Sequence, residues 1–120
     1  MPVQAMASAL ASPRVQATCI EINEYSAEIA RRVVASFGLQ DRITIVQADA
    51  TTVRLDDACD LLISETMHAA LTAEPVVAIM SHLHPFLSPG GIVLPSAIIV
   101  RAAVVPAREY EHPKGYVRLY

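Results

Sequence analysis

The chain has 120 residues, 53% of them hydrophobic, a length and composition suited to a single domain with a buried core. A net charge of −3, a pI of about 5.7 and scattered basic residues give no footprint for nucleic acid and no polybasic membrane patch. No unbroken apolar run reaches the ~18 residues of a membrane span, and Cys19 and Cys59 fit free thiols of a reducing compartment. We therefore expect a soluble, cytoplasmic protein.

The first half of the chain alternates predicted helices and strands. Residues 4–11 predict a helix, and residues 15–20 predict a strand that leads to Glu21. Asn23 or Ser26 can cap a second helix, and Gly38 stands where a glycine ends it. Residues 42–47 then predict a β-branched strand that leads to Asp49. The expected apolar side of the second helix is Ile29, Ala30, Val33, Val34 and Phe37.

The second half continues the alternation. Residues 60–64 predict a strand with Glu65 at its exit, and Pro75 predicts the first turn of a helix that Pro85 ends. The sequence SPGG at 88–91 predicts a turn, followed by strands at 92–94 and 97–105. Strands that alternate with helices are typical of parallel βαβ units, so we expect an α/β fold.

Three of the predicted strands lead to a carboxylate, namely Glu21, Asp49 and Glu65. Ligands of open parallel sheets bind beyond the carboxyl ends of the strands, so these side chains are expected along one rim. There, one carboxylate could accept hydrogen bonds from a ribose diol and another could accept one from an adenine amino group. The alternative is that each acid is solvated in a surface loop.

Two further patterns concern Glu74 and the histidines. Glu65 and Glu74 flank one short loop, although Glu74 could equally complement the dipole of the helix that follows it. The histidines are near no cysteine or third ligand at metal-site spacing, so we expect no metal site. They are His68, His82, His84 and His112.

Four segments together carry a resemblance to a known family. They are VQATCIEIN (15–23), GLQDRITIVQADA (38–50), CDLLISE (59–65) and FLSPGGIVLPSA (86–97). In order and spacing they resemble the class I S-adenosylmethionine-dependent methyltransferases, and most of all the protein arginine methyltransferase group. The resemblance implies a Rossmann-like sheet with helices on both faces, and S-adenosylmethionine as cofactor.

The resemblance also implies roles for individual residues. Glu21 matches the acid that holds the ribose hydroxyls of the cofactor, and Asp49 with the Ala50 backbone matches the adenine-binding position. Glu65 and Glu74 match the two catalytic glutamates, which clamp a guanidinium in the family through bidentate hydrogen bonds. The expected partner is a protein or small-molecule methyl acceptor. The residues between the glutamates depart from the family's aromatic and glycine pattern, which leaves arginine as acceptor open; they include Thr66, Ala69, Ala70 and Thr72.

The family's first strand and its glycine-rich turn have no counterpart in this sequence. We therefore expect residues 1–105 to form a partial, incomplete S-adenosylmethionine-binding domain, and residues 106–120 to begin a missing C-terminal region. A truncated form, a completing partner chain and a homo-oligomer are the alternatives, and the chain alone is expected to be inactive. The competing hypothesis is a non-catalytic α/β remnant that oligomerises or binds a nucleotide.

Overall fold

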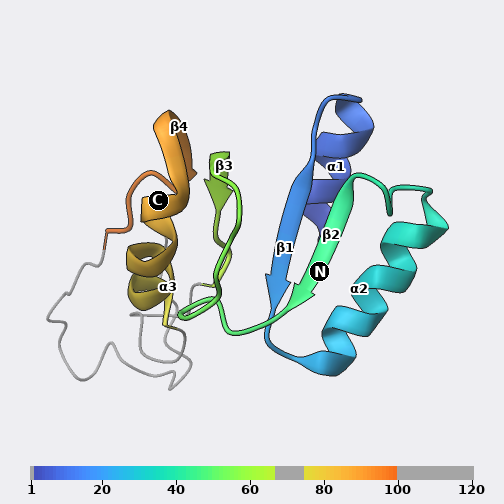
Figure 1. Cartoon of the computed structure of the whole chain (residues 1–120), viewed down its shortest axis with the longest axis horizontal. Coiled ribbons are helices and arrows are strands. Elements are labelled where there is room, and N and C mark those ends of the chain that lie inside the picture. The colour runs from blue at the N-terminus through green and yellow to red at the C-terminus, as the bar shows by residue number, and fades with distance from the viewer. Residues whose placement is uncertain (1, 67–74, 100–120) are drawn as a thin grey trace, which may run out of the picture. The chain divides into compact units, whose positions relative to one another are not determined.

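The computed structural model describes residues 2–66 and 75–99, and the chain divides into two compact units, Met1–Leu55 and Asp56–Tyr120 (Figure 1). The first unit alternates helices and strands as the sequence predicts. Helix α1 begins one residue earlier than predicted, and strand β1 begins two residues later and includes Glu21. The bounds are α1 Val3–Ala11, β1 Ala17–Glu21, α2 Glu24–Ser36 and β2 Ile43–Gln47.

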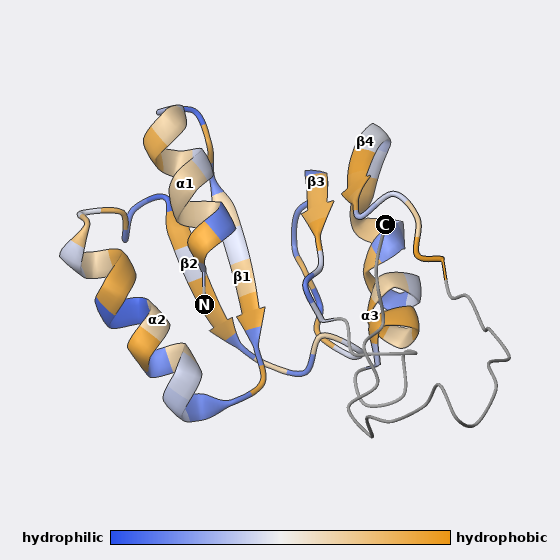
Figure 2. Ribbon diagram, turned by 180° about the vertical axis from the view of Figure 1, so that it is seen from behind, coloured by the Kyte–Doolittle hydropathy of each residue, from blue (hydrophilic) through white to orange (hydrophobic). Residues whose placement is uncertain are grey.

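Strands β1 and β2 of the first unit form a parallel pair in which Ala17 is opposite Ile43 and Glu21 is opposite Gln47. Both helices contribute to the same core cluster as the sheet, because α1 supplies Met6 and Ala9 while α2 supplies small and branched residues. In Figure 2, helix α2 carries both hydrophobic and hydrophilic residues, as is typical of a helix with one buried side. The buried core is Met6, Ala9, Ala27, Ala30, Val34, Leu39, Ile43 and Ile45.

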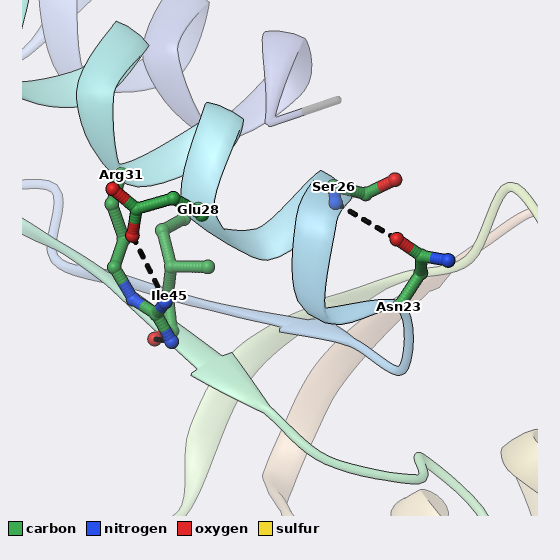
Figure 3. A network of polar contacts seen from close by, with 5 residues as sticks. All are labelled: Asn23, Ser26, Glu28, Arg31 and Ile45. Atoms are coloured by element: carbon green, nitrogen blue, oxygen red, sulfur yellow. Dashed lines mark hydrogen bonds and ion pairs between the residues drawn. The ribbon is translucent and has the colours of Figure 1, made fainter.

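Both ends of α2 have the caps that the sequence predicts. The Asn23 side chain accepts a hydrogen bond from the Ser26 amide at 2.9 Å, which satisfies one of the free amides of the first turn (Figure 3). At the other end Gly38 has φ of +67°, and the amide of Leu39 donates to the Val34 carbonyl at 3.1 Å. This is a Schellman motif with a buried Leu39.

Phe37 departs from the predicted apolar side of α2. Its side chain is 58% exposed, whereas Ala30 and Val34 are buried as expected. The helix ends at Ser36, and Phe37 is the C-terminal cap residue with φ of −96° and ψ of 3°. The helical periodicity therefore no longer sets the direction of its side chain.

The second unit contains a second parallel pair. Strands β3 and β4 are in register at Leu61 with Ile92 and at Ile63 with Leu94. Helix α3 follows Pro75, which is its N-terminal cap residue and not a first-turn residue, and a short 3-10 helix that includes Pro85 ends it. The bounds are β3 Cys59–Ile63, α3 Val76–Leu83, η2 His84–Phe86 and β4 Leu87–Leu94.

The predicted turn at 88–91 is part of β4. Between its first two register points β4 advances from Leu87 to Ile92, while β3 advances only from Cys59 to Leu61. The extra residues of β4 form an irregularity, and Gly90 has φ of +80°, a conformation that favours glycine. The SPGG sequence thus bends one strand instead of joining two.

The structure tests some of the remaining sequence predictions and not others. Residues 97–99 are not in a strand, and the rest of the predicted strand and the predicted boundary at residue 105 lie outside the described residues. Cys19 and Cys59 are both free and partly buried. Within residues 2–66 and 75–99, no helix has the length and apolarity needed to cross a bilayer.

Candidate functional site

Glu21 is the last residue of β1, and its carboxylate is oriented by the turn that follows. The backbone amide of Asn23 donates a hydrogen bond to Glu21 Oε1 at 3.0 Å. Asn23 also caps α2, so the same residue fixes both the start of the helix and the carboxylate. The Gln47 side chain, opposite Glu21 in the register, donates to the Ile22 carbonyl at 3.4 Å and ties this turn to the end of β2.

Asp49 lies just beyond the end of β2 and organises a tight turn. Its Oδ1 accepts two hydrogen bonds from Thr51, from the backbone amide at 2.8 Å and from the hydroxyl at 2.7 Å. The Asp49 carbonyl accepts hydrogen bonds from the amides of Thr52 and Val53. Ala50 is partly buried within this turn.

The parallel pairing brings Glu21 and Asp49 to the same end of the first sheet. The amide of Ala48 donates to the Glu21 carbonyl at 3.1 Å, so the chain segment that leads to Asp49 is still hydrogen-bonded to β1. Two carboxylates on neighbouring strand ends can accept hydrogen bonds from two donor groups of one ligand. This is the edge at which open parallel sheets bind ligands.

Glu65 follows β3 in the second unit and is exposed. Its neighbours are fixed: Ser64 is buried, its amide donates to the Leu94 carbonyl at 2.9 Å, and its hydroxyl shares a hydrogen bond with the Thr66 hydroxyl at 2.8 Å. An exposed acid between two anchored residues has a defined position at the strand exit. Glu74, the other predicted catalytic residue, lies outside the described residues.

Sequence reasoning did not find two contributors to the geometry of the acids, the Asn23 amide and Thr51. Both are two residues after the acid they contact. A local signal exists for the Thr51 amide, because an Asp side chain commonly accepts a hydrogen bond from the backbone amide two residues on, in an Asx turn. For Glu21 the donor is the main chain, so no residue type signals the contact.

Away from the strand ends, the described residues form a recess but no metal-binding cluster. A shallow recess of about 370 Å³ borders α2 and β2 and contains none of the predicted site residues. No group of three or more His, Cys, Asp or Glu in residues 2–66 and 75–99 is arranged to hold a metal ion. The recess is lined by Arg31, Val34, Ala35, Gln40, Ile43, Thr44 and Ile45.

A comparison with known protein families finds a match that spans the helices and strands described above. A family profile described as a methyltransferase domain matches residues 3–91, from α1 into β4. The chain belongs to the methyltransferase domain family. This confirms the class I methyltransferase resemblance that was drawn from the four sequence segments, and the Rossmann-like α/β fold class with it.

Individual relatives of this methyltransferase domain are larger proteins. The present chain is 34% identical over 110 residues to arginine N(omega)-methyltransferase of Streptomyces achromogenes subsp. streptozoticus. The alignment covers 88% of this chain and 30% of that protein. The chain is 31% identical over 102 residues to probable protein arginine N-methyltransferase 6.1 of Oryza sativa subsp. indica, covering 82% of this chain and 27% of that protein. The chain thus spans about 30% of the length of these curated relatives.

A solved structure supports the fold of the methyltransferase domain. The S-adenosylmethionine-dependent methyltransferase of Thiobacillus denitrificans, crystallised with S-adenosyl-L-homocysteine, aligns with a TM-score of 0.53 at 24% identity. The alignment covers 66% of this chain and 31% of that one. At this identity the likeness concerns the fold alone.

Proposed function

We propose that this chain contributes the cofactor-binding strand ends of an S-adenosylmethionine-dependent methyltransferase that transfers a methyl group to nitrogen. The observation that carries the proposal is the parallel pairing of β1 with β2, which brings Glu21 and Asp49 to one end of the sheet. In a methyltransferase domain, two acids at this edge fit the two hydrogen-bonding ends of an adenosyl group.

In the proposed complex, Glu21 accepts hydrogen bonds from the two ribose hydroxyls of the cofactor. The Asn23 amide supports this role because it holds Oε1 at 3.0 Å and thereby fixes the direction of the carboxylate. Asp49 accepts a hydrogen bond from the adenine amino group, and the Ala50 backbone contacts the ring. Binding would then position the sulfonium methyl group, which is the reactive part of the cofactor.

The proposed acceptor is a protein or small-molecule nitrogen nucleophile, with protein arginine as the first candidate. The arginine methyltransferase relatives favour this choice. Glu65 is exposed at the exit of β3, and Glu74 follows it in the sequence as the second proposed catalytic acid. Two carboxylates can clamp a guanidinium through paired hydrogen bonds, and methyl transfer then depends on orientation and electrostatics.

We also propose that a further strand, from a partner chain or a second copy, completes the first sheet. In the described residues each sheet has two strands, and the register directs the peptide groups of Thr18 and Ile20 away from β2. An open strand edge presents unpaired amides and carbonyls, which invites pairing with another strand. Light scattering across a range of concentrations tests this; a monomer at every concentration, with no partner retained on purification, contradicts it.

Calorimetric titration of S-adenosylhomocysteine into the full chain tests the proposed cofactor site. The expected result is weak binding that Glu21→Ala abolishes and that Glu24→Ala preserves. Glu24 is the matched control because it is an exposed acid three residues away, in the first turn of α2. No binding by the unmodified chain, or binding that survives Glu21→Ala, refutes the proposal. Adenosine that binds as tightly as S-adenosylhomocysteine favours the nucleotide-binding remnant.

A further inference from the structure

The two carboxylates at the end of the first sheet are held in different ways. Each accepts a hydrogen bond from the backbone amide two residues downstream, at 3.0 Å for Glu21 and at 2.8 Å for Asp49. Asp49 Oδ1 accepts a second bond, from the Thr51 hydroxyl at 2.7 Å. The orientation of Asp49 therefore depends on the residue type two positions after it.

We propose that Thr51 is a positioning residue, which fixes the Asp49 carboxylate in the direction needed to accept a hydrogen bond from the adenine amino group. This inference rests on the proposed function, because it assigns Thr51 to the adenine end of the same cofactor site. Thr51 itself contacts the carboxylate and not the cofactor, so it acts through Asp49.

The physical basis is the combination of a short bond and a stiff side chain. Hydroxyl donors to carboxylates form short, charge-assisted hydrogen bonds, and 2.7 Å is the upper end of their usual range. Threonine is β-branched and restricted at χ1, so its hydroxyl is held in place with little loss of entropy. A carboxylate already fixed in its binding orientation loses less freedom when the ligand binds.

The chain provides matched variants for the test. Thr51→Val keeps the shape and removes the hydroxyl, whereas Thr51→Ser keeps the hydroxyl. Thr52→Val is the control, because it removes a hydroxyl from the same turn whose contact, at a long 3.5 Å, is with the Asp49 carbonyl. We expect Thr51→Val to weaken S-adenosylhomocysteine binding by roughly three- to tenfold, because the freed carboxylate must then lose its rotational freedom when the ligand binds. Thr51→Ser and Thr52→Val should bind like the unmodified chain.

A second ligand separates positioning from general support of the turn. S-inosylhomocysteine has a carbonyl in place of the adenine amino group, so the loss caused by Thr51→Val should shrink or disappear with it. An equal loss for both ligands means that Thr51 only stabilises the turn, and it overturns the inference.

A ligand-free readout distinguishes failure of this inference from failure of the proposed function. Scalar couplings measured by NMR should show one χ1 rotamer for Asp49 in the unmodified chain and averaging in Thr51→Val. Averaging in both overturns the inference whether or not ligand binds. A fixed rotamer with no S-adenosylhomocysteine binding refutes the proposed function and, with it, the assigned role. Binding that Thr51→Val leaves unchanged overturns the inference alone.

Discussion

Replacement of Arg42 by Met should destabilise the first unit, because it releases the end of α1 from the start of β2. One guanidinium nitrogen of Arg42 donates to the Ala9 carbonyl at 2.7 Å and to the Ser12 carbonyl at 3.0 Å. These carbonyls lie at the C-terminal end of α1, where the helix leaves acceptors unsatisfied and where a cation interacts favourably with the dipole. Arg42 directly precedes β2, so its hydrogen bonds connect the C-terminal end of α1 to the sheet.

The magnitude follows from these contacts. A hydrogen bond to a charged group contributes about 1.5–3 kcal/mol, and because both bonds share one nitrogen we expect a loss of about 2–3 kcal/mol. For the 55 residues Met1–Leu55, typical stabilities per residue give a free energy of unfolding of about 3–8 kcal/mol. The substitution would therefore remove a large share of the stability of this unit.

Native-state hydrogen exchange measures this loss locally. The slowest amides of α2 and β2 report the opening free energy of the first unit without requiring the whole chain to unfold in one step. Arg32→Met is the matched control, since Arg32 is an exposed arginine on α2 and Met has a similar helix propensity. If Arg42→Met changes the opening free energy by no more than Arg32→Met does, the assigned role of Arg42 is wrong.

Two further substitutions or measurements test local features. Gly38→Ala should lower the free energy of unfolding by about 1 kcal/mol, because φ at this position is +67°. The added Cβ meets nothing within 4 Å, so the whole effect comes from backbone strain. Thermal melts should show Gly38→Asn to be less damaging, since Asn tolerates this conformation. Burial raises the pKa of the Cys19 thiol, so its alkylation at pH 8 should be slower in the folded chain than in urea, as peptide mass spectrometry would show. The pKa of Cys19 is higher in the folded chain than in the unfolded chain. The contribution of Cys19 to folding stability is therefore fully present below the pKa of the unfolded state, and it is lost as the pH rises through the pKa of the folded state. Equal alkylation rates in both states would contradict the assigned burial.

The local signals of the sequence predicted the first unit well. The cap at Asn23 and the glycine at Gly38 were found because each depends on a few adjacent residues. The placement of acids at strand ends followed from strand prediction alone, and the parallel pairing then brought Glu21 and Asp49 to the same end of the sheet.

The errors have two sources, the pairing of two distant strands and the end of a helix. The SPGG sequence has strong turn chemistry, yet pairing with β3 makes it an irregular part of β4. Phe37 fitted the helical pattern, but the helix had already ended at the cap. The spacing of Glu65 and Glu74 predicts only that both flank one short stretch of sequence, because spacing does not determine the distance between two side chains.

Among residues 2–66 and 75–99, the two units use their strands differently. The buried apolar side chains of the first unit include residues of α1, α2 and β2, whereas β3 and β4 contribute no fully buried side chain. The carboxylates proposed to hold the cofactor therefore follow strands that share a core with two helices, and the acid proposed to meet the acceptor follows a strand whose side chains are more accessible. Substitutions along β3 should thus alter acceptor preference with little effect on the core that supports the cofactor end, since changes at exposed positions seldom alter stability much.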